Sequence, residues 1–269
     1  MKYLLALLIG LQLLNVYAQE KEVSVYHEVL EDQSINIYAK NHTNVWQSVN
    51  VEGKIKGMTA STDLPVLTLL TGNETKLITN LVPEEGKSYS YKYKYTFIIG
   101  DVTAEHNDDY VYRLPFPKGQ EYLVGQSYNE FPTHINQFAI DFNMDEGTKI
   151  SAIRDGVVLQ VVDKHSKGCP NESCSKYNNY IMVRHEDGSI ADYSHIQKKG
   201  ALVQLGDSVK AGQVIAKSGS TGWASGPHLH LEVYVMRFTG QESVKVEYHL
   251  DNSTIGIPKT NESYRQTLN

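Results

Sequence analysis

The segment GPHLHLEV at residues 226–233 could present two imidazoles to one ligand. Alternate side chains of a strand point to the same face, so His228, His230 and Glu232 share one side. The leucines and the valine between them then pack into a core on the other side. Imidazole is a common zinc ligand, and a catalytic zinc usually has three protein ligands and an open position for water. Taken alone, the segment fits two half-exposed histidines without a function equally well.

A carboxylate in a second apolar segment favours the metal interpretation. Asp141 lies inside the run FAIDF at residues 138–142, and His134 precedes it by a short segment. Aspartate is disfavoured in strands, and a buried charge is costly unless it is paired or bound to a metal. His134, Asp141 and His230 together offer two nitrogens and one oxygen, a suitable donor set for zinc. The alternative is a structural role for Asp141, such as capping a turn.

A third histidine ends another expected strand. His195 follows Tyr193 and Ser194 in the segment 190–195. It is either a surface residue at a strand end or an acid–base group or hydrogen-bond donor beside the metal. His106 lies close to two aspartates, at 108 and 109, but three polar residues in one exposed turn are expected to form a solvated loop.

Five segments that follow one another in the chain resemble the lysostaphin/LytM family of zinc endopeptidases. In order they read FAIDF, GTKISAIRDGVV, NNYIMVRHEDGSIADYSHI, GDSVKAGQVIAKSGSTG and SGPHLHLEVY. They cover roughly residues 126–236, which is under half of the chain. The resemblance implies the Duplicated Hybrid Motif fold, a compact antiparallel β-sheet with the site in an open groove.

The resemblance also implies roles for five residues. It implies that His134, Asp141 and His230 bind Zn²⁺, while His195 and His228 act in catalysis as acid or base, without saying which does which. The implied substrate is a cross-link or stem peptide of peptidoglycan. This sequence departs from many family members at one point: six residues, INQFAI, separate His134 from Asp141, where three are usual. The longer segment also contains an asparagine and a glutamine, at 136 and 137, that could hydrogen-bond the His134 ring.

The chain divides into four expected parts. Residues 1–18 predict a signal peptide, because a positive start and an apolar run precede the small-residue pattern Val-Tyr-Ala. Residues 19–117 predict a β-rich, sandwich-like domain, in which residues 88–97 alternate aromatic and polar side chains as a half-buried strand does. Residues 120–236 predict the peptidase domain, a barrel-sandwich-hybrid-like sheet, and 237–269 a polar tail. The expected fold class is all-β.

The composition narrows where the protein acts and on what. Its formal net charge is -6, and no basic stretch resembles a nucleic-acid footprint. No second long apolar run follows the signal segment, so we expect an exported, soluble protein in the periplasm or outside the cell, without a membrane span. Cys169 and Cys174 are the only cysteines, and in an exported protein a disulfide is expected rather than two free thiols.

Two other functions are compatible with parts of the pattern. One is a non-catalytic LytM-like module that binds the cell wall or activates an amidase; such modules typically have degraded ligand sets, whereas all five positions are kept here. The other is a biotinyl- or lipoyl-type carrier, because GDSVKAGQVIAKSG resembles half of that fold. Carriers need an acceptor lysine at a tight turn between strands, and the sequence offers no such setting.

Overall fold

Strands make up nearly all of the regular structure, and the all-β prediction is confirmed. The computed structural model describes residues 22–268, so the predicted signal peptide lies outside the described residues. The one helix among those residues is the short 3₁₀ helix η1 (Glu172–Tyr177). Within the same range no helix has the length and apolar character needed to cross a membrane.

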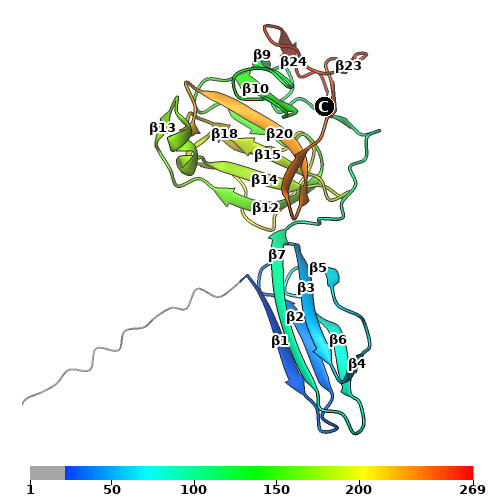
Figure 1. Ribbon diagram of the computed structural model, residues 1–269. Coiled ribbons are helices and arrows are strands. Elements are labelled where there is room, and N and C mark those ends of the chain that lie inside the picture. Colours follow the sequence, from blue (N-terminus) through cyan, green and yellow to red (C-terminus); the bar gives the residue numbers. More distant parts are fainter. Residues whose placement is uncertain (1–21, 269) are drawn as a thin grey trace, which may run out of the picture.

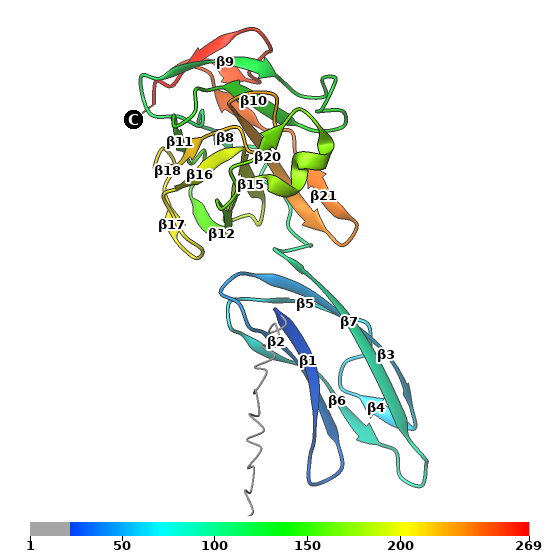
Figure 2. The ribbon, with the colours of Figure 1, turned by 90° about the vertical axis from the view of Figure 1, so that its left-hand side faces the viewer.

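Two sheets face each other in the N-terminal unit, which we define as residues 22–100 (Figures 1 and 2). One sheet has the order β1 (Val23–Val29), β2 (Ile35–Asn41), β6 (Thr75–Pro83), β4 (Met58–Ala60), and the other β5 (Val66–Leu70), β3 (Gln47–Lys56), β7 (Ser90–Ile99). Strand β7 is the expected alternating strand: Tyr91, Tyr93 and Tyr95 pack against the core between the sheets, and the residues between them are exposed. Period-two alternation is what gives a sheet one buried and one solvated face.

A nine-stranded sheet dominates the rest of the chain. Its order is β17 (Ser208–Val209), β12 (Gly156–Val162), β14 (Tyr180–Arg184), β15 (Ile190–Ser194), β20 (His228–Arg237), β10 (Ala139–Asn143), β9 (Glu121–Gln126) and β24 (Ser263–Arg265), with β21 (Gly240–Ser243) paired to β20. Three small sheets accompany it: β11 (Lys149–Ser151), β18 (Val214–Ser218) and β16 (Ile196–Ala201); β23 (Ile255–Gly256), β22 (Glu247–His249) and β8 (Val111–Tyr112); β13 (Gly168–Cys169) and β19 (Gly222–Trp223).

The two faces of the large sheet differ in chemistry. One face carries Ile140, Leu229, Leu231 and Tyr193, all fully buried in one hydrophobic core. These residues alternate with the polar ones of the same strands, so the opposite face carries the histidines and carboxylates. The apolar face fixes the register, because a slip of one residue would bring polar groups into the core.

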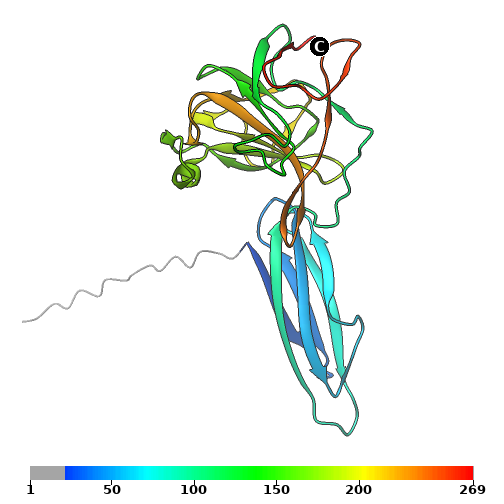
Figure 3. The ribbon, with the colours of Figure 1, turned by 45° about the horizontal axis from the view of Figure 1, so that its top comes forward.

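Segments beyond both expected ends of the peptidase domain pack on the core of the large sheet. Tyr112, Leu114 and Phe116 precede the expected boundary near residue 117, yet all are fully buried in the core of the large sheet. The expected polar tail also packs there: β24 pairs with β9, and Tyr264 joins the core. Figure 3 shows this C-terminal segment (red) at the end of the molecule far from the N-terminal unit. Both segments thus pack on the core of the large sheet, although each supplies isolated large apolar side chains rather than a periodic run.

The N-terminal unit packs against the histidine-bearing face of the large sheet. Val45, Ile98 and Ile99 form a small hydrophobic cluster with Ile190 and Tyr234, together with further residues of both units. Tyr234 follows the histidines on β20 at even spacing, so this cluster covers the same face at one end. The two units also meet at Arg184 of the large sheet. Its guanidinium carbon lies 3.6 Å from the centre of the Trp46 ring.

Candidate active site

Strand pairing brings three site positions into one row. In the antiparallel register, Asp141 of β10 lies opposite His230 of β20, and Ser194 of β15 lies opposite His230 on the other side. Cross-strand neighbours on one face have Cβ atoms about 4.5–5.5 Å apart, which is close enough for their side chains to share a ligand. His228 lies two residues before His230 on the same face, so its ring joins the group.

His134 reaches this row from the loop between β9 and β10. A compact turn holds it, with His134 N–H donating to Glu130 O (3.0 Å) and Gln137 N–H donating to His134 O (3.0 Å). The side chain is 1% exposed, and its Nε2 lies 3.3 Å from Asp141 Oδ1. The longer spacing before Asp141 therefore does not carry the ring away from the sheet.

The donor atoms of His134, Asp141 and His230 suit one metal ion. They all lie within 4.8 Å of one another, and His230 Nδ1 lies 2.9 Å from Asp141 Oδ1. Two ligands at about 2 Å from a tetrahedral zinc are themselves about 3.3 Å apart. The structure thus brings the three predicted ligands together in one group that could hold a metal ion.

An unpartnered nitrogen supports the fit to a cation. His134 Nδ1 lies 3.0 Å from the carbonyl oxygen of Ser127, which can only accept, so Nδ1 carries the proton and Nε2 a lone pair. His134 Nε2 is buried without a hydrogen-bond partner, a costly state that a metal ion would relieve. The residues at 136 and 137, expected to hydrogen-bond this ring, do not do so; the Ser127 carbonyl takes that place.

Charge and burial work against each other at this site. Burial raises the pKa of Asp141, but the hydrogen bond from His230 and the electrostatic influence of the His134 and His230 rings outweigh burial and hold that pKa far below its ordinary value. Burial likewise lowers the pKa of His230, and the Asp141 carboxylate more than compensates and raises it. A carboxylate that stays ionised and two imidazole nitrogens form a donor set typical of zinc.

The two remaining histidines lie beside the donor set. The ring centres of His195 and His228 are 4.5 Å apart, and His228 Nε2 lies 4.0 Å from the second carboxylate oxygen of Asp141. His195 Nδ1 donates to Thr221 O (2.7 Å) and His228 Nδ1 to Gly226 O (2.9 Å). Because carbonyls only accept, both neutral rings keep an unprotonated Nε2. Burial, with charge from the neighbouring histidines, lowers the pKa of His195 to about 3.

A cavity lies over these side chains, and its walls come from two loops. The His134 loop supplies one wall through Thr133 and Gln137. The other wall includes Trp223, 42% exposed, and two polar residues of the η1 region, Ser175 and Asn178. Of these five positions the sequence analysis named only Gln137, and it missed the other four because none of them lies in a periodic pattern. The glycine-rich turn just before His228 was the one signal that Trp223 lies near the site.

A disulfide closes the loop beside Trp223. Cys169 and Cys174 are bonded, as predicted from the sequence. Strand β13 pairs in parallel with β19, which sets Cys169 beside Trp223. The disulfide-closed loop and the tryptophan are therefore one local structure at the rim of the cavity.

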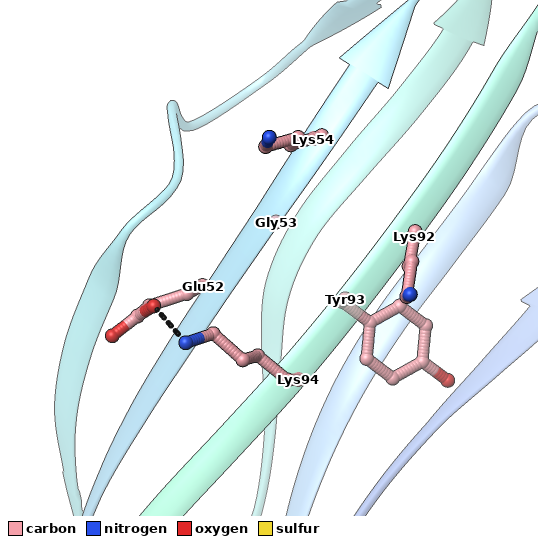
Figure 4. A pocket seen from close by; sticks show the side chains of 6 residues that line it. All are labelled: Glu52, Gly53, Lys54, Lys92, Tyr93 and Lys94. Carbon is pink, nitrogen blue, oxygen red and sulfur yellow. Dashed lines mark ion pairs between the residues drawn. The ribbon is translucent and has the colours of Figure 1, made fainter.

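Two other places on the described chain do not form comparable sites. His106 uses both ring nitrogens, one with Asp108 (2.8 Å) and one with Tyr112 (3.0 Å), and its side chain is largely buried, so the expected solvated loop is partly packed. A hollow on β3 and β7 is lined by lysines around one ion pair, Glu52 with Lys94 (Figure 4). Exposed ion pairs contribute about 0–1 kcal/mol, and ammonium groups are not metal ligands.

A segment of the chain that contains most of this site matches a known protein family. Residues 136–245 match the family model described as Peptidase family M23, a segment that begins two residues after His134. Glycyl-glycine endopeptidase ALE-1 of Staphylococcus capitis is 32% identical over 146 residues, 53% of this chain and 37% of that protein. Peptidoglycan DD-endopeptidase ShyC of Vibrio cholerae is 38% identical over 96 residues, 35% of this chain and 19% of that protein.

One solved structure extends the comparison. The catalytic domain of lysostaphin from Staphylococcus simulans aligns with 28% identity and a TM-score of 0.34, covering 46% of this chain and 87% of that one. The chain spans well under half the length of the two curated relatives named above. Over residues 136–245, this chain carries a peptidase family M23 domain of the lysostaphin/LytM type.

Proposed function

We propose that this protein is a zinc-dependent endopeptidase that acts after export and hydrolyses peptide bonds in bacterial peptidoglycan. The observation that carries the proposal is the convergence of His134, Asp141 and His230 within 4.8 Å, beside the two rings of His195 and His228. The relatives are a glycyl-glycine endopeptidase and a peptidoglycan DD-endopeptidase, and their activities support the substrate class.

His134 Nε2, His230 Nδ1 and the Asp141 carboxylate would hold the metal. Zn²⁺ bound there supplies a Lewis acid that polarises the scissile carbonyl and lowers the pKa of a bound water to about 7. The Ser127 carbonyl fixes the tautomer of His134, so that its lone pair points at the site. Asp141 stays ionised, which balances part of the ion's charge.

His195 and His228 would move the protons. Each neutral ring has its Nδ1–H tied to a backbone carbonyl, so only Nε2 is available to the reacting groups. One Nε2 would accept the proton of the attacking water and pass it to the leaving amine, and the other ring, protonated from solvent before the attack, would stabilise the negative charge that develops on the carbonyl oxygen. The fixed tautomers leave either ring able to take either role.

The alternative function is a non-catalytic module that binds the cell wall or activates an amidase. Such a module needs no acid–base pair and no open metal site. The buried, unpartnered nitrogen of His134 favours the enzyme, because this arrangement is costly without a metal. The shared tautomer of the other two rings also favours it, because both rings then have Nε2 available for a reaction.

The test uses the purified mature chain. We expect about one zinc per protein by elemental analysis, and release of soluble peptides from insoluble peptidoglycan, with both lost in Asp141→Ala and in His230→Ala. Glu186→Gln, an exposed acidic residue elsewhere on the domain, is the matched control and should keep both. Metal-loaded wild type that leaves peptidoglycan intact would refute the enzymatic proposal, and full zinc in both ligand variants would refute the ligand assignment.

A further inference from the structure

His195 follows β15 at a position that would normally face the hydrophobic core. Two residues of β15 lie on the polar face, opposite residues of β20: Asp192 opposite Glu232 and Ser194 opposite His230. Ala191 and Tyr193 alternate with them and lie in the core. An uninterrupted strand would therefore point His195 into the core beside Tyr193. Its ring lies on the polar face instead, with its centre 4.5 Å from that of His228.

A left-handed backbone conformation at His195 breaks the alternation. Its φ is 66°, in a region that few residues other than glycine adopt. The next residue, Ile196, begins β16 and returns to the hydrophobic core. One left-handed residue between two strands thus turns a single side chain to the polar face. Such a conformation is strained and persists only where neighbouring contacts hold it.

The side chain of Asn178 supplies contacts that hold this turn. Its Oδ1 accepts from His195 N–H (3.1 Å), and its Nδ2 donates to Ser194 Oγ (2.9 Å). The pairing of β14 with β15 ends at Tyr180 and Ser194, so a side chain takes over the hydrogen bonding where the neighbouring strand stops. One amide group therefore fixes both the left-handed residue and the residue before it.

The backbone around Asn178 is itself fixed. Asn178 ends the 3₁₀ helix η1, where its N–H donates to Ser175 O (3.0 Å), and the Cys169–Cys174 disulfide closes the same segment. Its Cα lies against Gly222, where an added Cβ would come within 2.8 Å of it. These contacts allow Asn178 to hold its neighbours in place, which a mobile surface residue could not do.

The ring of His195 is held separately from its backbone. Its Nδ1 donates to Thr221 O (2.7 Å), and Thr221 Oγ1 in turn donates to Ile196 O (2.9 Å). The hydrogen bonds to the ring and to the backbone thus come from two different loops. Removal of the Asn178 side chain would release the backbone turn and leave the Thr221 carbonyl in place.

We propose that Asn178 is a positioning residue, which holds the left-handed turn at His195 and so keeps the His195 ring beside the metal site. The inference rests on the proposed function and deepens it, because it adds a residue that acts on the reaction only through His195. The pairing of β10 with β20, which places Asp141 and His230, involves neither residue of this contact. Zinc binding therefore does not depend on Asn178.

The test replaces Asn178 by alanine and measures zinc content and the hydrolysis of a soluble peptidoglycan fragment. We expect kcat to fall by about tenfold to a hundredfold, the effect that two lost hydrogen bonds can have, with KM and zinc content unchanged. Ser175→Ala is the matched control, because Ser175 lines the same wall of the cavity and its side chain does not bond His195. The control should keep the kcat of wild type, and an equal kcat in Asn178→Ala would overturn the proposal.

A double-mutant cycle separates positioning from a merely structural role. If Asn178 acts only through His195, Asn178→Ala should have no further effect in a His195→Ala background. The double variant should then match the activity of His195→Ala within about twofold, since the two changes remove the same contribution. Effects that multiply instead would show that Asn178 acts by another route, and the proposal would fail.

Amide hydrogen exchange tests the contact without any hydrolysis. The His195 N–H should exchange about tenfold faster or more in Asn178→Ala than in wild type, because it loses its acceptor. The N–H of Leu231, on a strand paired on both sides, should be unchanged. A protein that shows this difference and does not cut peptidoglycan would support the role of Asn178 in holding the turn and contradict the enzyme. Unchanged exchange at His195 would contradict that role, whether or not the protein is an enzyme.

Discussion

Replacing His134 by alanine should abolish tight zinc binding, although its loop lies outside the sheet. The ring is buried, Ser127 O orients it, and its Nε2 lies 3.3 Å from Asp141 Oδ1. The substitution leaves Asp141 and His230 in their strand register, because neither pairing involves the loop. The variant therefore tests one ligand without disturbing the other two.

The expected loss follows from the energy of zinc binding. Four-ligand zinc sites bind with about 10–16 kcal/mol, or about 2.5–4 kcal/mol for each ligand. At about 1.4 kcal/mol for each factor of ten, His134→Ala should weaken zinc binding by about 10²–10³-fold. Removing the ring also removes the buried unpartnered nitrogen, so the metal-free variant should be destabilised less than a typical buried histidine replacement would suggest.

Zinc affinity can be measured by competition with a chromophoric chelator of known affinity. Thr133→Ala is the matched control, because this exposed neighbour in the same loop bonds Gln126 and contributes no ligand. The control should bind zinc as wild type does. An affinity of His134→Ala within about threefold of wild type would refute the assignment of His134 as the first ligand.

Three further predictions concern other parts of the molecule. His195→Ala and His228→Ala should each keep stoichiometric zinc in elemental analysis and lose peptide hydrolysis by about a hundredfold or more, since each removes a positioned acid or base. Replacing Cys169 and Cys174 by serine should lower stability by about 2 kcal/mol, as expected for so short a loop, and leave zinc binding unchanged; two free thiols in native protein would contradict the disulfide. Burial lowers the pKa of His185 to about 4, so its contribution to stability is fully present above the unfolded pKa of about 6.5 and is lost as pH falls towards 4. Denaturation at several pH values should show up to about 3 kcal/mol less pH dependence in His185→Gln than in wild type, and identical profiles would contradict this.

The sequence predicted the parts of the site that depend on local pattern. Alternation around His230, and a charge inside the apolar run at Asp141, were enough to place both residues on half-buried strands. Their register was not predictable, because it depends on pairing between residues 89 positions apart in the chain. Glu232 was visible beside the histidines, but its relation to Asp192 requires the same long-range pairing.

The segments at the edges of the domain were harder to predict. Phe116 lies between two prolines, a pattern typical of a joint, yet it is fully buried in the main core. Tyr264 lies in a polar stretch that reads as a tail and yet packs on the same core. Single large side chains can bury an irregular segment without any periodicity, so pattern reading does not find them.

The hydrophobic cluster between the two units would limit the length of a bound peptide on one side of the site. It covers the sheet face at Tyr234, four residues past His230 on β20. At about 3.3 Å per residue, a peptide lying along this strand has about 13 Å, or roughly four residues, between the donor row and the N-terminal unit. For the endopeptidase proposed above, the fold would therefore leave room for only a short piece of a peptide that lies along β20 towards the N-terminal unit.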